Sequence, residues 1–162
     1  MVRLIMNSYK LVQNDRMKLL TKLKSNSVQL IITSPPYNIG KSYEKKKPFE
    51  LYLKEQEKTL IECFRILKKK GSLCWQVGSY FEKSELYPLD IFIYEICKKI
   101  GFKLRNRIIW HFEHGLHSNK KFSGRYETIM WFTKSDDYYF DFDDIRVPQK
   151  YPGKVGYKGK NK

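Results

Sequence analysis

The chain reads VQLIIT at residues 28–33 and continues as SPPY at residues 34–37. A short apolar run that ends at two prolines is typical of a central strand buried on both faces of a sheet, because proline lacks the amide donor that a strand ladder needs. The sequence therefore predicts a strand over residues 28–33 that ends in a rigid turn.

Helices are predicted on both sides of this strand, with a short one expected before it over residues 17–24. The helix after the strand begins near Phe49, carries apolar side chains at helical spacing, and is expected to run through 68–70 to a stop at Gly71. The next helix keeps spacings of three and four residues from Leu86 onward and is expected to stop at Gly101.

Three further strands are predicted, over Ser72–Val77, Lys103–His111 and Tyr126–Thr133. Strands that a helix joins are parallel, whereas the last two are joined by a polar loop and can be antiparallel. The predicted fold class is therefore α/β, with a mostly parallel sheet and one reversed edge strand. The tryptophans of these strands are expected in the core: Trp75, Trp110 and Trp131.

Composition narrows the class of protein. The 162 residues suit one domain, and 32 Lys and Arg against 17 Asp and Glu give a net charge of +15, which favours a polyanionic partner, most often nucleic acid. No apolar run is long enough to cross a bilayer, and the three cysteines show no disulfide or metal-binding pattern. We expect a cytoplasmic protein without a membrane partner. Residues 145–162 contain six basic residues and no acidic residue, and are expected to form a flexible basic tail.

The turn at residues 34–37 suits a planar ligand that bears an amino group. Ser34 and the carbonyl of Pro35 can accept hydrogen bonds from an exocyclic amine, while Tyr37 can stack its ring face on the ligand. Two acceptors draw the amine nitrogen toward tetrahedral geometry, which frees its lone pair to attack an electrophile. The plain structural alternative is an ordinary proline-proline strand exit with a packing tyrosine.

The string Thr33–Tyr37 resembles the catalytic motif of the amino-methylating DNA methyltransferases, which transfer a methyl group from S-adenosylmethionine to cytosine N4 or adenine N6. The resemblance extends to residues 65–77, 107–110 and 126–134, and covers roughly residues 9 to 150. It implies a Rossmann-like methyltransferase sheet, S-adenosylmethionine as cofactor, double-stranded DNA as substrate with a flipped target base, and a place in restriction–modification. The catalytic residues that it implies are Ser34, Pro35, Pro36 and Tyr37. Serine in the motif favours cytosine N4 over adenine N6.

The family's glycine-rich cofactor loop, a Phe-x-Gly-x-Gly-like turn after a strand, has no counterpart in this sequence. In the permuted subgroup of the family, the catalytic half comes first, a DNA-recognition segment follows, and the cofactor half comes last. The resemblance thus implies a catalytic half over 1–144 and the start of a recognition segment over 145–162. It predicts a truncated or split methyltransferase, or a fragment of one, and in a split enzyme a second polypeptide would supply the cofactor half. The alternative is a non-catalytic basic fragment that binds nucleic acid.

Side chains outside the turn also receive candidate roles. By the resemblance, Asp15 lies near the cofactor purine, whereas its place before a helix favours a simple N-cap. A DNA or base-pocket role is expected for four residues, with solvated or packing roles as the alternative: Asn38, Lys41, His114 and Tyr126. Histidines recur at 111, 114 and 117, but no cysteine is near them and no metal site is predicted.

Overall fold

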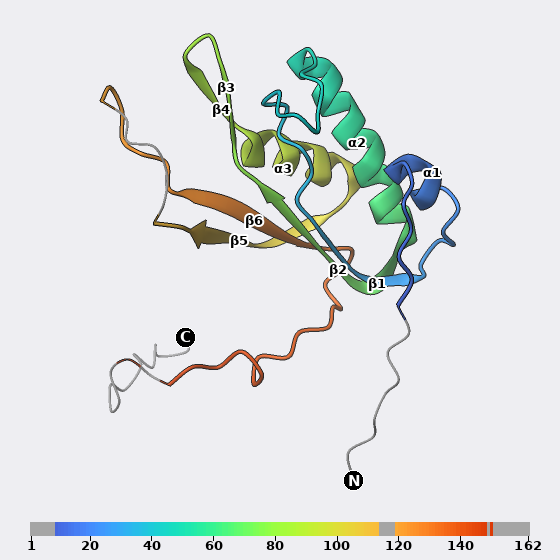
Figure 1. Cartoon of the computed structure of the whole chain (residues 1–162). Coiled ribbons are helices and arrows are strands. Elements are labelled where there is room, and N and C mark those ends of the chain that lie inside the picture. Colours follow the sequence, from blue (N-terminus) through green and yellow to red (C-terminus); the bar gives the residue numbers. More distant parts are fainter. Residues whose placement is uncertain (1–8, 114–118, 149, 151–162) are drawn as a thin grey trace.

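The computed structural model describes residues 9–113, 119–148 and 150. In chain order its elements are α1 (Arg16–Leu20), β1 (Val28–Thr33), α2 (Phe49–Ile66), β2 (Leu67–Val77), β3 (Ser79–Glu82), β4 (Glu85–Pro88), α3 (Leu89–Ile100), β5 (Lys103–His111) and β6 (Tyr126–Thr133) (Figure 1). The α/β class is confirmed, and β1, β5 and β6 have the bounds that the sequence predicts.

The main sheet has the strand order β1-β2-β6-β5. β1 and β2 are parallel, and β6 is antiparallel to both of its neighbours. The reversed strand is thus confirmed, but it lies inside the sheet rather than at its edge. The helical crossover through α3 places β5 one position away from β2, and β6 returns into that gap, where Met130 and Phe132 are fully buried. Sequence periodicity carries no information about this order of strands.

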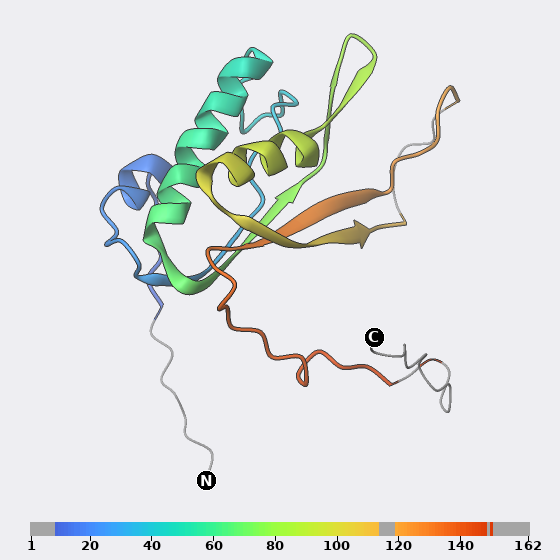
Figure 2. The ribbon, with the colours of Figure 1, turned by 180° about the vertical axis from the view of Figure 1, so that it is seen from behind.

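One face of the sheet is covered by all three helices (Figures 1 and 2). Alternate residues of β2, among them Leu73 and Trp75, point to this face and are fully buried, because successive side chains of a strand point to opposite faces. Leu60 of α2 and Ile93 of α3 pack against them in one apolar cluster. Burial of this single layer between sheet and helices is the main source of stability for the chain.

The second face of the sheet carries no helix within the described residues, and we call it the bare face. Register assigns to it an apolar set from all four strands: Leu30, Ile32, Cys74, Ile108, Trp110, Ile129 and Trp131. Ile32 is 72% exposed and Trp110 is 56% exposed, so the expectation of a core position is confirmed for Trp75 and wrong for Trp110. The segment after β6 runs along this face, where the rings of Tyr138 and Phe140 pack on Trp131.

Two local predictions differ from the structure. α2 ends at Ile66, and residues 68–70 belong to β2, because the backbone of Leu67 is already extended and begins the strand. β3 and β4 form a hairpin that the helical spacing from Leu86 concealed, so α3 begins only after Pro88. The stop of α3 at Gly101 is confirmed, with a left-handed φ of 110° that glycine adopts without strain.

The N-terminal helix is shorter than predicted and begins with a side-chain cap. Asp15 Oδ1 accepts hydrogen bonds from the backbone amides of Met17 and Lys18, at 3.0 and 3.1 Å. These bonds satisfy two amides that the first helical turn leaves without an intrahelical partner. The N-cap alternative for Asp15 is therefore confirmed. In the described part of the chain, no helix has both the length and the apolarity that crossing a membrane requires.

The helix-to-strand passage between α2 and β2 yields a stability prediction. A Cβ atom on Gly71 would lie 2.8 Å from Leu67 Cγ and 2.9 Å from the carbonyl oxygen of Gln29, whereas no atom of the described residues lies within 4 Å of one on Gly124. Gly71→Ala should therefore lower the free energy of unfolding by about 1–3 kcal/mol, the usual effect of overpacking. Urea denaturation followed by circular dichroism measures it, with Gly124→Ala as the control. Equal midpoints for the two variants would contradict this packing.

Candidate active site

The proline turn leaves β1 at its carboxyl end, which is where open α/β sheets hold their ligands. Pro35 is buried and fixes the turn to the body of the protein, whereas the side chain of Ser34 is exposed and Tyr37 is half-buried. The two prolines restrict φ at consecutive positions, so the turn is rigid before any ligand arrives. Ser34 is thus an accessible polar group on a fixed backbone.

A chain of hydrogen bonds runs from Ser34 into the sheet. The hydroxyl oxygens of Ser34 and Tyr37 lie 3.0 Å apart, and Tyr37 donates to Glu127 Oε2 at 3.0 Å. Gln76 Nε2 donates to the same carboxylate oxygen at 2.6 Å. Because β6 is antiparallel, its first residues lie at the edge where β1 and β2 end, and this brings Glu127 to the turn.

The ring of Tyr37 is fixed by close packing as well as by its hydroxyl. A Cβ atom on Gly78 would lie 3.0 Å from Tyr37 Cε2, so a side chain at this position would push against the ring. Burial, aided by the nearby Glu127 charge and against the hydrogen bond with Ser34, raises the pKa of Tyr37 to about 12. The phenol is therefore protonated at neutral pH and able to donate to Glu127.

A cavity of about 470 Å³ opens beside the turn. It brings together the four predicted catalytic residues with Lys41, and adds three that the sequence analysis did not assign to it: Ile39, Tyr43 and Glu127. The space is bordered by a hydroxyl, an aromatic ring, a cation and a carboxylate. A planar heterocycle with an exocyclic amine matches this combination of groups.

A second and larger cavity, of about 830 Å³, lies on the other side of Pro36 and reaches Asp15. Tyr52 and Gln56 of α2 border it with buried side chains, yet Tyr52 Oη and Gln56 Oε1 have no hydrogen-bond partner among the described residues. Burial also raises the pKa of Tyr52, which keeps its hydroxyl as a donor. Two such polar atoms beside a carboxylate fit a ligand rich in amino and hydroxyl groups.

The remaining predicted residues lie around these cavities in different ways. Asn38 borders the larger cavity with its side chain buried, and Tyr126 borders a third cavity of about 240 Å³ on the far side of Glu127. His114 lies outside the described residues, as does His117. Among the residues described, no group of three or more His, Cys, Asp or Glu side chains could hold a metal ion.

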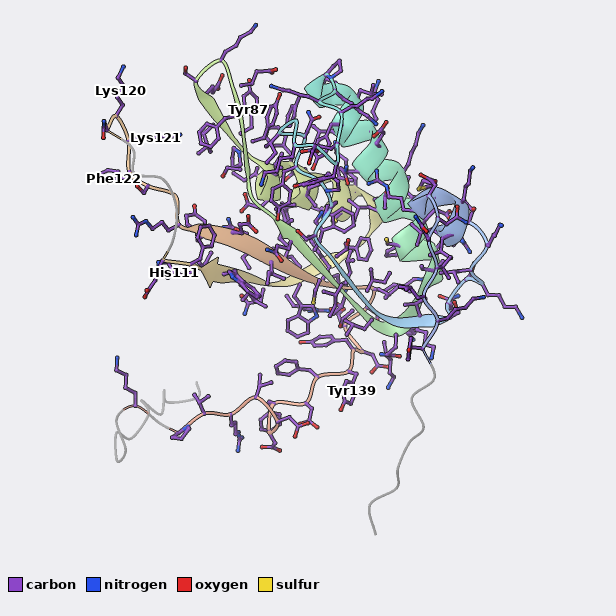
Figure 3. All side chains as sticks on the ribbon, in the orientation of Figure 1. Tyr87, His111, Lys120, Lys121, Phe122 and Tyr139 are labelled. Carbon is purple, nitrogen blue, oxygen red and sulfur yellow. The ribbon has the colours of Figure 1, made fainter. Side chains whose placement is uncertain are left out.

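Basic and aromatic side chains extend beyond the site at the same end of the sheet (Figure 3). His111 ends β5, and the loop that follows presents Lys120, Lys121 and the 99% exposed Phe122. Lys121 Nζ lies 3.5 Å from the ring centre of Phe81 on the β3–β4 hairpin, so the loop and the hairpin are in contact. This end of the molecule therefore combines positive charge with exposed ring faces.

Glu127 and Gln76 are side chains that the structure connects to the turn and that the sequence analysis did not assign to the site. The sequence analysis gives no role to either residue. Both are polar residues near the ends of apolar strands, which is the available signal, but no local pattern indicates that Glu127 bonds Tyr37 or that Gln76 bonds Glu127. The sequence interpretation used only the ring face of Tyr37, and the structure engages its hydroxyl as well.

The loop after the turn is held by the side chain of Asn38, which supports a prediction. Asn38 has a φ of 63°, donates to the carbonyl of Lys47 at 2.8 Å, and accepts from the amide of Lys47 at 2.7 Å. Asn38→Ala removes both bonds and strains the backbone, so residues 39–46 should be cleaved at least several-fold faster by trypsin. Asn26→Ala is the control, because Asn26 also has a positive φ, of 54°. Equal cleavage rates in the two variants would show that Asn38 does not hold the loop.

Comparison with known proteins agrees with this geometry. Residues 28–162 match the model of a family described as DNA methylase. The chain is 50% identical over 154 residues to the Type II methyltransferase M.BglII of Bacillus subtilis, a match that covers 94% of this chain and 43% of that protein. It thus spans about half the length of the curated relatives it matches.

The chain also resembles solved structures, among them the following two. TTHA0409 from Thermus thermophilus, in complex with S-adenosyl-L-methionine, superposes with a TM-score of 0.63 at 27% identity, over 83% of this chain and 58% of that one. PvuII DNA methyltransferase, which is cytosine-N4-specific, shares the fold with a TM-score of 0.67 at 20% identity, over 82% of this chain and 51% of that one. The family model covers far more than half of the sequence, and the chain belongs to the DNA methylase family of N4/N6 amino-methyltransferases.

Proposed function

We propose that the chain is the catalytic half of a site-specific DNA methyltransferase, which moves a methyl group from S-adenosylmethionine to the exocyclic amine of a flipped base. The observation that carries the proposal is the exposed Ser34 hydroxyl on a proline-fixed turn, beside the ring of Tyr37 and a cavity of about 470 Å³. Membership of the DNA methylase family supports it. The proposed compartment is the cytoplasm, where bacterial DNA lies.

The turn would act by positioning and polarisation. Ser34 Oγ and the backbone carbonyl of Pro35 would accept the two hydrogens of the target amine, which localises the lone pair on nitrogen. Tyr37 would stack on the extruded base and hold its plane. We favour cytosine N4 over adenine N6 because serine occupies the first motif position. No covalent bond to the protein is required, so the three cysteines have no part in the reaction.

The larger cavity is the proposed place for part of the cofactor. Tyr52 and Gln56 would bind its polar groups, since each carries a buried atom that lacks a partner among the described residues. Asp15 borders the same cavity and could contact the cofactor in addition to capping α1, because both cap bonds use Oδ1. When bound, S-adenosylmethionine supplies the activated methyl group. The family's glycine-rich loop, which has no counterpart in the sequence, would have to come from the other half of the enzyme.

The bare face is the proposed docking surface for that other half. Mostly parallel sheets have helices on both faces, whereas here the second face exposes Leu30 and Ile32. The relatives contain more than twice the length of this chain, which is enough for the missing layer. Gln76 and Glu127 follow the same register as the bare face, so the covering half would close the site on the side of Ser34. A second polypeptide or a continuation of this one would serve equally.

Double-stranded DNA is the proposed substrate, held by the positive charge around the site. Lys41 borders the smaller cavity, and Lys120 and Lys121 extend from the neighbouring loop. Residues 145–162 would begin the recognition segment, although most of them lie outside the described residues. The alternative is a basic fragment that binds nucleic acid without catalysis, which the absent glycine loop favours for the chain on its own.

Complementation tests the proposal. The chain is mixed with the separately expressed remainder of M.BglII, tritiated S-adenosylmethionine and unmethylated bacterial DNA, and single-turnover methylation is measured. The mixture should methylate DNA and the chain alone should not. Ser34→Ala should lower the rate by roughly 10²–10³, the effect of losing one polarising contact. Ser42→Ala, the same change in the following loop, should not. Native turnover by the Ser34→Ala variant would contradict the catalytic role of the turn, which would then be only the end of a strand.

The docking surface has its own test. Ile32→Glu places a charge on the bare face, and Ile91→Glu places one on α3, at a side chain that is 56% exposed on the helix side. Ile32→Glu should weaken complementation at least about tenfold, because an unpaired carboxylate buried in an interface is strongly unfavourable. Ile91→Glu should complement normally, and circular dichroism should be native for both. Normal complementation by Ile32→Glu would place the interface elsewhere.

A further inference from the structure

We propose that Glu127 is a positioning residue that sets the direction of the hydrogen bond between Ser34 and Tyr37, so that Ser34 presents lone pairs to the target amine. The catalytic consequence of this inference rests on the proposed function, whereas the hydrogen-bond geometry does not. It concerns a chain of polar contacts that joins the exposed turn to the interior of the sheet: Ser34, Tyr37, Glu127 and Gln76.

The direction follows from counting protons. The oxygen–oxygen distance of 3.0 Å between Ser34 and Tyr37 leaves either hydroxyl free to be the donor. A carboxylate only accepts hydrogen bonds, and a phenol has a single proton. Because Tyr37 gives that proton to Glu127 Oε2, its oxygen remains as an acceptor toward Ser34. Ser34 must therefore be the donor in the Ser34–Tyr37 contact.

This direction makes serine a better acceptor. A serine hydroxyl has one proton and two lone pairs, and in water it donates and accepts without preference. With its proton held by Tyr37, the Ser34 oxygen has both lone pairs available to the cavity and no proton that would repel the amine hydrogens. Its oxygen also gains electron density from the bond it donates, since hydrogen bonds in a chain polarise one another.

Gln76 supports the arrangement from behind. Its Nε2 donates to the same Oε2 atom at 2.6 Å, which supplies the carboxylate with a second partner and holds it in place on the ladder between β2 and β6. Gly78 leaves the space in which the Tyr37 ring lies. The direction of the hydrogen bond in the exposed turn after β1 is thus set by side chains of β2 and β6.

A consequence distinguishes this chain from one with aspartate at position 34. A carboxylate at position 34 could only accept a hydrogen bond from Tyr37. The single proton of Tyr37 is already donated to Glu127. Serine at 34 and glutamate at 127 therefore form a matched pair. Ser34→Asp should be much more harmful with Glu127 present than after Glu127→Gln, because the glutamine releases Tyr37 to donate to the new carboxylate.

The first test is a double-mutant cycle on this chain without DNA or cofactor. Unfolding equilibrium constants are measured for the chain, Ser34→Asp, Glu127→Gln and the double variant. Ser34→Asp should lower the folding constant in both backgrounds, but roughly tenfold more when Glu127 is present than when Glu127→Gln is present. A coupling of this size is typical of side chains that share one hydrogen-bond network. Repeating the cycle with Tyr37→Phe should remove most of the coupling. Additive effects, or a coupling unchanged by Tyr37→Phe, would overturn the proposal.

The second test observes Tyr37 directly. The chain is labelled with ¹³Cζ-tyrosine, and the Tyr37 resonance is identified by its loss in Tyr37→Phe. Glu127→Gln should lower the pKa of Tyr37 from its raised value of about 12, because the nearby charge and the acceptor are part of its cause. Glu95→Gln, the same change on the exposed face of α3, should leave it unchanged. An unchanged pKa of Tyr37 in the Glu127→Gln variant would refute the hydrogen bond between Tyr37 and Glu127.

The complemented enzyme connects the pair to catalysis. Tyr37→Phe and Glu127→Gln should each lower the single-turnover rate by about tenfold, and the double variant by no more than either, since both act through one hydroxyl. If the rate losses of the two single variants multiply in the double variant, Glu127 does not act through the Tyr37 hydroxyl. If no complementation occurs at all, the proposed function fails while the cycle and the titration still decide the role of Glu127.

Discussion

The site depends on the insertion of one reversed strand between two parallel ones. β6 pairs with β2 on one side and with β5 on the other, so its first residues lie where β1 and β2 end. With β6 at the outer edge, Glu127 would lie a strand further from Tyr37, beyond the reach of a hydrogen bond. The turn at residues 34–37 would remain, but its hydroxyls would have no defined direction. The geometry of the candidate site after β1 is therefore a property of the sheet order.

A sheet covered by helices on one side only is a second constraint with a functional meaning. The helices bury Leu73, Trp75, Met130 and Phe132 from one face, and this is sufficient for an apolar core. The other face leaves apolar side chains in water, and each of them would contribute favourable free energy if a partner covered it. Tyr138 and Phe140 cover part of this face through Trp131. The same hydrophobic effect that folds the chain would thus favour the proposed docking of a second layer on the bare face.

Local signals in the sequence were sufficient for several elements and insufficient for others. The bounds of β1 follow from an apolar run and two prolines, and the end of α3 follows from Gly101, whose left-handed φ marks the stop. The predicted end of α2 is wrong because a glycine after three lysines resembles a helix stop, whereas Gly71 is a strand residue that Leu67 and Gln29 approach closely. The proposal that residues 34–37 form a catalytic turn rests on these residues and on their resemblance to a family. The role of Glu127 required the pairing of strands some 50 residues apart in sequence, which no local pattern contains.

Rigidity at the site is obtained in two different ways, and the difference matters for what the turn can do. Before Tyr37 the prolines restrict the backbone covalently, so order there costs little entropy on binding. After Tyr37 the loop is held by Asn38, a residue with a positive φ that costs roughly 1 kcal/mol and is offset by two hydrogen bonds to Lys47. The acceptors are thus permanent, whereas the wall that carries Lys41 is held by bonds that can break. Under the proposed function, a flipped base would enter the cavity past the loop that carries Lys41, without displacing the acceptor atoms of the turn.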